Sequence, residues 1–330
     1  MQDGIGTGGK MTTRIIGTGS YAPEQIVTND DLAKIMDTSD EWIRSRTGIG
    51  ERRITMGDST SDMAAKAAER AIEQAGISPE EIDMILVATS SPDYCFPNGA
   101  CEVQARVGAV NAACYDISAA CTGFVFALNT AHAFISAGFC RTALVIGADT
   151  ISKLVDWADR GTCVLFGDGA GAVVVRADET GILGMNMQSN GEKAGVLTCA
   201  ARDNGNFLLN KKPELGYMTM EGQEVFKFAV KKVPECITRL LQGTNVAKEE
   251  VKYFVIHQAN YRIIEAISKR LKVDLEKFPA NMEHYGNTSG ASVPILLDEM
   301  NREGKLEAGD KIVLAGFGAG LTWGATLIQW

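Results

Sequence analysis

Short apolar runs alternate with amphipathic stretches along most of the chain. In the first half, the apolar spacing of residues 61–75 predicts a helix that ends at a glycine, and the run 82–87 predicts a buried strand. In the second half, residues 223–241 and 251–256 repeat this pair, although Pro234 is expected to kink or divide the second helix. Strands that are apolar throughout are typical of sheets covered by helices on both faces. The pattern therefore predicts an α/β fold.

The two halves of the chain echo each other at a shift of about 169 residues. Three pairs of segments align at or near this shift: 81–87 with 250–256, 142–147 with 311–316, and 15–17 with 182–184. Identity within each pair is low, but three pairs in nearly one register favour a duplicated unit over coincidence. We therefore expect an N-terminal half at 11–180 and a C-terminal half at 181–330.

Two segments do not follow this repeat. Residues 1–10 are glycine-rich and precede a second methionine, so we expect them to form a flexible extension outside the fold. Between about 185 and 221 the periodicity fades and turn residues accumulate. A connection of that length is usually functional, and we expect it to form a lid or one wall of a pocket.

Composition narrows the class of protein. Of 330 residues, 45% are apolar and 22% charged, which is ordinary for a globular enzyme, and no apolar run is long enough to span a bilayer. With no secretory signal visible, we expect a cytoplasmic protein without a membrane partner. A net charge of −9 argues against nucleic acid as the main partner.

The cysteines do not suggest a metal centre. There are eight of them with only three histidines, they are scattered, and no Cys-x-x-Cys pair occurs. Structural zinc normally needs clustered ligands, so we expect no metal site. Most of these cysteines have apolar neighbours and are interpreted as small buried side chains.

Cys121 is the exception. It follows a small-residue turn and precedes an apolar stretch, 124–137, that predicts a long helix. A thiol at a helix N-terminus faces unpaired backbone N–H groups and the positive end of the helix dipole, and both favour the thiolate. The position predicts a nucleophile that carries an acyl group.

His257 and Asn287 are candidate partners of Cys121. His257 stands where the apolar strand 251–256 ends, followed at once by polar Gln258 and Asn260. At the 169-residue shift Cys121 aligns with Gly290, just after the Asn287 turn, so a duplicated fold brings these turns together. Each residue alone has an ordinary interpretation, as a structural histidine or as a turn asparagine.

The other two histidines are weaker candidates for the active site. His132 lies inside the apolar helix after Cys121 and is expected to be structural. His284 lies near Asn287, so it is a possible neighbour of the site, but we prefer His257.

Three glycine-rich segments raise the question of nucleotide binding: 17–19, 167–171 and 316–320. A dinucleotide fingerprint needs a strand before the glycines and a helix after them. Here Pro23 follows the first segment closely, and the other two lead into strand-like sequence, so we expect strand–turn–strand and no dinucleotide.

Basic residues collect on one predicted helix after Asn260. Arg262, Lys269 and Arg270 share a face of that helix, and Lys227 lies in the helix before it. The ordinary interpretation is a solvated face. In an acidic protein, a basic strip beside an active-site segment also suits an anionic partner.

Taken together, these residues resemble the β-ketoacyl-acyl-carrier-protein synthase III family, condensing enzymes of the thiolase fold. The resemblance covers residues 14–330. It is carried by six motifs in order: Thr-Ser-Asp-Glu-Trp-Ile (38–43), Ala-Cys-Thr-Gly-Phe (120–124), Gly-Asp-Gly-Ala-Gly (167–171), His-Gln-Ala-Asn (257–260), Gly-Asn-Thr-Ser (286–289) and Gly-Phe-Gly-Ala-Gly-Leu-Thr-Trp-Gly (316–324).

The resemblance implies a duplicated five-layered αβαβα sandwich with two mixed sheets, a homodimer, and no cofactor beyond the coenzyme A thioester used as substrate. Cys121 would accept an acyl group from acyl-CoA, most simply acetyl-CoA, with the oxyanion held by the backbone N–H groups of Cys121 and Ala319. His257 and Asn287 would then stabilise the enolate formed when malonyl-acyl carrier protein loses carbon dioxide. The product would be a 3-oxoacyl-acyl carrier protein that initiates type II fatty acid synthesis.

The resemblance also assigns binding residues. Coenzyme A would be held by Trp42, Arg46, Arg160 and Asn260, and the acyl pocket would be limited by Phe166 and, from the partner subunit, by Phe96. Carrier-protein docking would fall to Arg262, with Lys269, Arg270 and Lys227. Two departures stand out: Ala319 replaces a common glycine, and Gly50 replaces a common arginine.

Two alternative functions remain open from the sequence alone. A synthase of the same fold can use another starter, of polyketide or alkylquinolone type. A cysteine hydrolase also uses cysteine, histidine and asparagine.

Overall fold

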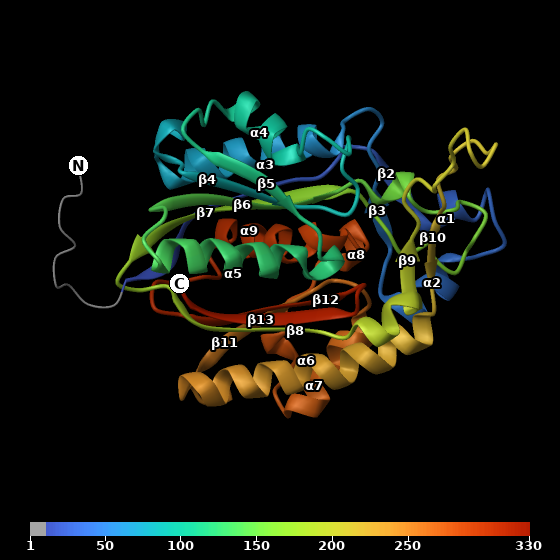
Figure 1. Ribbon diagram of the computed structural model, residues 1–330. Helices are drawn as coiled ribbons and strands as arrows, with labels where there is room; N and C mark the ends of the chain where they lie inside the picture. The colour runs from blue at the N-terminus through green and yellow to red at the C-terminus, as the bar shows by residue number, and fades with distance from the viewer. Residues whose placement is uncertain (1–10) are drawn as a thin grey trace.

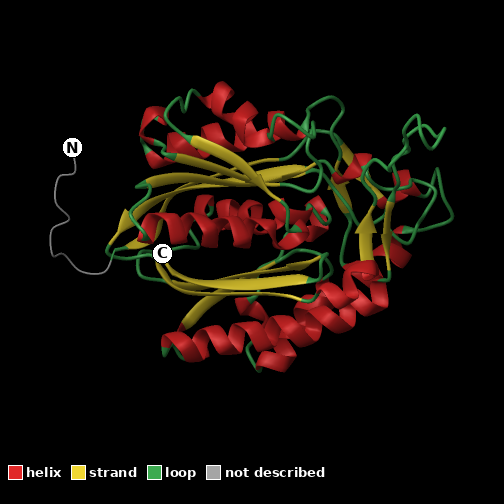
Figure 2. Ribbon diagram, viewed as in Figure 1, coloured by secondary structure: helices red, strands yellow, loops and turns green. Residues whose placement is uncertain are grey.

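The computed structural model describes residues 11–330; the extension predicted for residues 1–10 lies outside the described residues. Five layers stack on one another, helix, sheet, helix, sheet and helix (Figure 1). This is the duplicated αβαβα sandwich that the resemblance implied, and Figure 2 shows the two sheets separated by a helical middle layer.

The first sheet is built from the N-terminal part of the chain. Its strand order is β1-β7-β6-β4-β5, with β4 parallel to β5 and β6, and with β7 antiparallel to β6 and β1. It is therefore a mixed sheet. The bounds are β1 Thr12–Tyr21, β4 Met84–Ala88, β5 Ala113–Ile117, β6 Thr142–Asp149 and β7 Gly169–Asp178.

The second sheet repeats four of these five strands. Its order is β11-β12-β13-β8, with β11 parallel to β12 and the other pairs antiparallel. The bounds are β8 Ile182–Ser189, β11 Val251–Ile256, β12 Lys311–Gly318 and β13 Thr322–Gln329. The three echoed segments of the sequence lie in equivalent strands: β4 with β11, β6 with β12, and β1 with β8.

Helices cover both sheets and fill the space between them. One outer layer holds α3 and α4, the middle layer α5 and α9, and the other outer layer α6 and α7 (Figure 1). Their bounds are α3 Thr60–Ala75, α4 Gly99–Val107, α5 Gly123–Ser136, α6 Gly222–Thr244, α7 Tyr261–Leu271 and α9 Ser292–Arg302. The buried strands and helices form separate apolar clusters on the two sides of each sheet.

The remaining elements lie at one end of the sandwich. They are α1 Asn29–Leu32, α2 Asp40–Thr47 and α8 Met282–Tyr285, the pair β2 Ile26–Thr28 and β3 Glu51–Arg53, and the pair β9 Leu197–Cys199 and β10 Met218–Met220. The last pair belongs to the segment where periodicity faded.

Two local expectations need correction. Of the two outcomes expected at Pro234, a kink or a division, the division does not occur, because α6 runs as one helix from Gly222 to Thr244. The glycines at 17 and 19 are not a loop but lie inside β1, where they allow α3 to pack closely: a Cβ at Gly17 would lie 2.4 Å from the carbonyl oxygen of Ala71.

Candidate active site

Cys121 lies in a short 3₁₀ turn, Ala120–Thr122, that leads directly into α5. The residue before it, Ala120, adopts φ 47°, a left-handed conformation that is uncommon for alanine. A strained non-glycine residue beside a nucleophile is typical of a functional turn. It places the thiol at the junction of two cavities.

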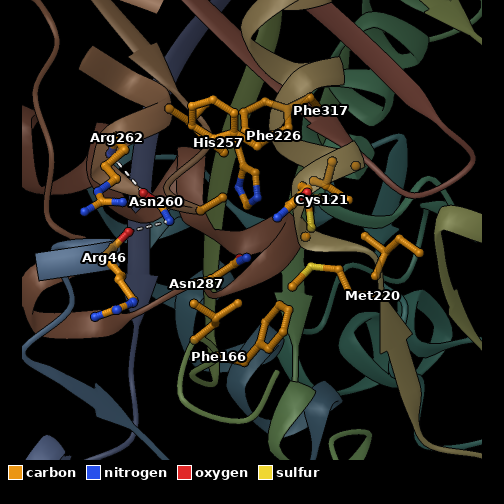
Figure 3. A pocket seen from close by; sticks show the side chains of 18 of the residues that line it. Arg46, Cys121, Phe166, Met220, Phe226, His257, Asn260, Arg262, Asn287 and Phe317 are labelled. Carbon is orange, nitrogen blue, oxygen red and sulfur yellow. Dashed lines mark hydrogen bonds between the residues drawn. The ribbon is translucent and has the colours of Figure 1, made fainter. Parts of the chain in front are cut away.

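The larger cavity, of about 890 Å³, contains the three predicted catalytic residues. Cys121, His257 and Asn287 all line it, together with apolar side chains such as Phe166 and Phe317. Figure 3 shows these side chains converging from different elements. The turns that the sequence analysis expected to come together therefore share one chamber.

His257 is held rigidly at the end of β11. Its backbone N–H donates to the carbonyl of Ala315 at 2.9 Å, and its ring meets that of Phe317 edge to face at 5.0 Å. Nδ1 lies 2.7 Å from the hydroxyl of Ser292, which also accepts the N–H of Gln258 at 3.3 Å. In the tautomer whose Nδ1 accepts from the Ser292 hydroxyl, the ring carries its proton on Nε2.

Asn287 is fixed by backbone pairing with the strand-like segment at Phe166. Its N–H donates to Leu165 at 2.8 Å, and its carbonyl accepts from Gly167 at 3.1 Å. Its side-chain oxygen accepts the N–H of Ser289 at 2.9 Å, while its amide nitrogen points into the cavity (Figure 3). The site thus presents two neutral N–H donors, from His257 and Asn287.

Burial decides the charge state of this site. Burial lowers the pKa of His257 to about 3, so the imidazole is neutral at physiological pH. Burial also raises the pKa of Cys121 to about 12; the hydrogen bond with Ser289 opposes this rise, and the carboxylate of Asp149 adds to it. For Cys121, burial thus acts against the thiolate, which the helix N-terminus favours.

A second cavity, of about 360 Å³, opens on the other side of Cys121. It shares Cys121, Phe166 and Leu197 with the first and is lined further by Ala319 and Ser289. The segment 197–220 contributes side chains to both cavities, which confirms that the aperiodic connection forms a wall of the pocket.

The end of β12 packs directly on the nucleophile. A Cβ at Gly318 would lie 2.9 Å from the nitrogen of Cys121, so only glycine permits this approach. Ala319 follows and lines the second cavity, and it is not among the residues with positive φ. Alanine is thus accommodated at this position without backbone strain.

The mouth of the larger cavity carries the predicted coenzyme A contacts. Trp42 and Arg46 line it, and the guanidinium groups of Arg46 and Arg160 lie 4.6 Å and 5.3 Å from the centre of the Trp42 ring. Arg160 does not itself line the cavity, but its neighbour Gly161 does.

Asn260 caps α7 with its side-chain oxygen and donates to the carbonyl of Arg46 at 3.0 Å. These bonds tie α7 to α2 across the mouth. Gly50, noted as a departure, lies under the Arg44 guanidinium: a Cβ there would be 2.3 Å from Nη2.

The basic residues divide into two groups. Arg262 and Lys227 line the mouth, and Arg262 donates to the carbonyl of Ser45 at 2.6 Å. Lys269 and Arg270 are exposed in the last turn of α7, about 11 Å further along the helix axis.

Other predicted residues lie elsewhere. Phe96 is 86% exposed and lines neither cavity of its own chain, whereas Phe166 is buried and lines both. His284 is largely exposed beside Glu51 and does not line either cavity. His132 bonds to the hydroxyl of Thr13 at 2.8 Å, as expected of a structural histidine.

Three residues at the site were not predicted from the sequence: Ser289, Ser292 and Asp149. The serines lie in the Asn287-Thr288-Ser289-Gly290-Ala291-Ser292 run, and Asp149 ends the apolar strand β6. Polar residues that end an apolar strand were the signal used for His257, and the same signal applies to Asp149.

Within residues 11–330, no group of three metal-ligating side chains comes together, and no helix has the length and apolar character needed to cross a membrane.

A duplicated αβαβα sandwich with a cysteine, a neutral imidazole and an amide in one chamber defines the condensing acyltransferases of the thiolase fold. Family models for 3-oxoacyl-[acyl-carrier-protein] synthase III match residues 115–191 and, for the C-terminal part, 241–330. The chain is 54% identical to a beta-ketoacyl-[acyl-carrier-protein] synthase III of Clostridium acetobutylicum over 97% of its length and 99% of the relative's. A solved 3-oxoacyl-[acyl-carrier-protein] synthase III from Aquifex aeolicus superimposes with a TM-score of 0.90 at 46% identity, covering 96% of this chain and all of that one.

The chain therefore belongs to the β-ketoacyl-acyl-carrier-protein synthase III family. A priming β-ketosynthase from the R1128 polyketide pathway is also similar, with a TM-score of 0.90 at 33% identity over 99% of each chain.

Proposed function

We propose that the protein condenses an acyl-CoA primer, most simply acetyl-CoA, with malonyl-acyl carrier protein to give a 3-oxoacyl-acyl carrier protein, the step that initiates type II fatty acid synthesis. The observation that carries the proposal is the position of Cys121, which lines two cavities at once. One cavity offers the N–H donors of His257 and Asn287, and the other offers space for an acyl group.

In the first half-reaction, the sulfur of Cys121 attacks the thioester carbon of the primer. The backbone N–H groups of Cys121 and Ala319 hold the oxyanion, an interaction that typically contributes about 3 kcal/mol per donor. The tetrahedral intermediate then expels coenzyme A, whose sulfur takes up the proton that Cys121 has lost, and the acyl chain remains in the smaller cavity beside Phe166.

In the second half-reaction, the malonyl thioester occupies the larger cavity. Nε2–H of His257 and the amide of Asn287 donate to its thioester oxygen, where negative charge develops as carbon dioxide leaves. The enolate carbon attacks the acyl carbon, the bond from that carbon to the sulfur of Cys121 breaks, and the sulfur takes up a proton from solvent. A neutral imidazole serves this step because it donates without needing to lose a proton.

The mouth of the larger cavity binds coenzyme A in the first half-reaction and the carrier protein in the second. Trp42 is the stacking surface for the adenine, so the Arg46 and Arg160 side chains that now lie over its ring move toward the phosphates of coenzyme A when it binds. Asn260 contacts the pantetheine. Arg262 and Lys227 at the rim, with Lys269 and Arg270 further along, meet the acidic carrier protein.

We also propose a homodimer in the cytoplasm. Strand β5 is the edge of the first sheet, and the exposed Phe96 lies on the segment before α4 that packs on β5. An apolar side chain this exposed suits burial in the acyl pocket of the partner subunit.

Intact-mass measurement tests the proposed function. Incubation with acetyl-CoA should attach one acetyl group to the wild type and none to Cys121→Ser. Added malonyl-acyl carrier protein should then remove that group and yield 3-oxobutanoyl-acyl carrier protein. Release of acetate without a carrier-bound product would instead indicate a hydrolase and overturn the proposal.

A further inference from the structure

The two N–H groups assigned to the oxyanion belong to two different turns. One is the N–H of Cys121, in the turn Ala120–Thr122, and the other is the N–H of Ala319, in the hairpin turn 319–321 that joins β12 to β13. Within residues 11–330, no protein group accepts a hydrogen bond from the Ala319 N–H. Two donors stabilise one oxyanion only when both lie about 2.7–3.1 Å from it, so the position of one turn relative to the other matters.

Both ends of the hairpin turn are fixed by the backbone. At its start, Gly318 packs on the nucleophile turn so closely that a Cβ there would lie 2.9 Å from the nitrogen of Cys121. At its end, Leu321 and Asn190 exchange both of their backbone hydrogen bonds, at 2.8 Å and 2.9 Å. Ala319 lies between these fixed ends and is followed by Gly320, which has φ 131°. Because glycine adopts many backbone conformations, the fixed ends alone do not set the orientation of Ala319.

A pair of threonine hydroxyls joins the two turns at this point. Oγ1 of Thr122, the residue after Cys121, lies 2.9 Å from Oγ1 of Thr322, and the Thr322 hydroxyl donates to the carbonyl of Ala319 at 2.9 Å. When the Thr322 hydroxyl donates its one proton to Ala319, the Thr122 hydroxyl is the donor of the bond between the two threonines. The bridge therefore runs from the residue beside the nucleophile to the residue that carries the second N–H.

The longer contacts of both hydroxyls join the same two turns. Oγ1 of Thr122 lies 3.2 Å from the carbonyl oxygen of Thr322, and Oγ1 of Thr322 lies 3.4 Å from the carbonyl oxygen of Ala119. Thr122 is fully buried and Thr322 is half-buried. Hydrogen bonds shielded from water in this way are stronger than exposed ones, so the bridge is suited to hold the turns in one arrangement.

We propose that Thr322 is a positioning residue for acyl transfer. Its hydroxyl ties the hairpin turn to the nucleophile turn, so that the N–H groups of Cys121 and Ala319 face the same oxyanion. The inference rests on the proposed function, because this oxyanion forms when Cys121 attacks an acyl thioester. Thr322 acts through Ala319 and donates no hydrogen bond to the reacting atoms.

A contact between Thr322 and the primer is the competing role, because Thr322 also lines the smaller cavity. Valine has nearly the shape of threonine but lacks the hydroxyl. Thr322→Val therefore keeps the wall of the cavity while it removes the bridge. A wall contact affects how tightly the primer binds, whereas a misplaced N–H donor affects the rate of the chemical step.

A matched variant on the same strand controls for the loss of a buried hydroxyl. Thr326 lies four residues beyond Thr322 in β13, and its buried hydroxyl donates to the side-chain oxygen of Asn129 at 2.7 Å. Thr326→Val removes this hydroxyl and leaves both turns intact. A general loss of stability should therefore appear in both valine variants, and a loss of positioning only in Thr322→Val.

The measurement is single-turnover transfer of acetyl from acetyl-CoA to Cys121. We expect Thr322→Val to lower the maximal rate by about tenfold, the equivalent of one hydrogen bond, without changing the acetyl-CoA concentration that gives half of this rate. Thr326→Val should keep the wild-type rate, and Thr322→Ser, which retains the hydroxyl, should recover most of it. Equal rates for the wild type and Thr322→Val, or equal losses in both valine variants, would overturn the positioning role.

Two further readouts sharpen the test. Decarboxylation of malonyl-acyl carrier protein without a primer depends on His257 and Asn287, so it should keep the wild-type rate in Thr322→Val. A loss of decarboxylation parallel to that of acetylation, or weaker binding of acetyl-CoA at an unchanged maximal rate, would contradict the proposal. Thr122→Val removes the other hydroxyl of the bridge and should also slow acetylation; an unchanged rate in this variant would count against the bridge even if Thr322→Val did not fold.

The wild type separates this inference from the proposed function. If the wild type takes up no acetyl group from acetyl-CoA, the proposed function fails. If the wild type is acetylated and Thr322→Val is acetylated equally fast, only the positioning role of Thr322 fails.

Discussion

The turn that carries Cys121 and the turn that follows Asn287 occupy equivalent positions in the two halves of the molecule. Each is a short 3₁₀ turn, Ala120–Thr122 and Ser289–Ala291, and each leads into a helix of the middle layer, α5 or α9. Each also begins with a non-glycine residue at positive φ, Ala120 at 47° and Ser289 at 52°. These two residues are related by the same 169-residue shift as the echoed strands.

The side chains of the two turns differ where their backbones agree. The first turn has alanine and then the nucleophile, whereas the second has serine and then Gly290. The strained backbone therefore belongs to the duplicated framework and does not itself mark a nucleophile. Because the side chains differ, the first turn carries the nucleophile of acyl transfer, Cys121, whereas the second turn follows the N–H donor Asn287.

The largest expected effect comes from removing the N–H donors of the second half, His257 and Asn287. His257→Ala and Asn287→Ala should each reduce condensation by about 10²- to 10³-fold, because an N–H donor to the enolate oxygen is lost. Acetylation of Cys121 should persist in both, since neither residue holds the first oxyanion. The measurement is single-turnover acetylation beside product formation with malonyl-acyl carrier protein; loss of acetylation alone would contradict the roles assigned.

Strand β6 of the first half crosses the Ser289–Ala291 turn of the second half. A matched pair of glycine variants tests how closely the two pack at this crossing. A Cβ at Gly147 of β6 would lie 2.2 Å from the carbonyl oxygen of Gly290, whereas a Cβ at Gly290 would meet its nearest atom at 3.4 Å. Gly147→Ala should therefore lower the free energy of unfolding by about 3 kcal/mol, and Gly290→Ala by less than about 1 kcal/mol. Denaturant melts of both variants provide the comparison, and equal effects would mean that the crossing is not tight.

The same crossing explains what was and was not predictable from the sequence. The strands of both halves were predicted because an apolar run is a local signal, and Cys121, His257 and Asn287 were assigned because their motifs resemble a family. Asp149 was missed because its hydrogen bond from the Gly290 N–H exists only where β6 crosses the Ser289–Ala291 turn. The burial of Cys121 could not be predicted for a similar reason: a helix N-terminus is visible in the sequence, but the burial that raises the pKa of the thiol is a tertiary property.

A smaller effect is expected from Ser292, which is three residues beyond Ser289 in the same run. Ser292→Ala removes the hydroxyl on Nδ1 of His257, so the ring loses the bond that keeps its proton on Nε2. Condensation should fall by about tenfold, the equivalent of one hydrogen bond, while acetylation is unchanged. Slower acetylation with normal condensation would contradict this role of Ser292.

The smallest effect concerns the surface, where the two halves differ again. Under the 169-residue shift, Arg262 of the second half aligns with Asp93 of the first, so the two halves carry opposite charges at this position. Arg262→Glu should raise the KM for malonyl-acyl carrier protein about fivefold, in line with the modest contribution of one rim charge, and spare the KM for acetyl-CoA. The effect should shrink as salt is added, because exposed charges are screened.

Lys269→Glu is the matched control for this last variant. It makes the same charge change about 11 Å further along α7, away from the cavity lining. If the carrier protein docks over the mouth, the KM for malonyl-acyl carrier protein should respond more to residue 262 than to residue 269. Equal responses would mean that the whole basic strip attracts the carrier by net charge, and that the mouth itself does not set where it docks.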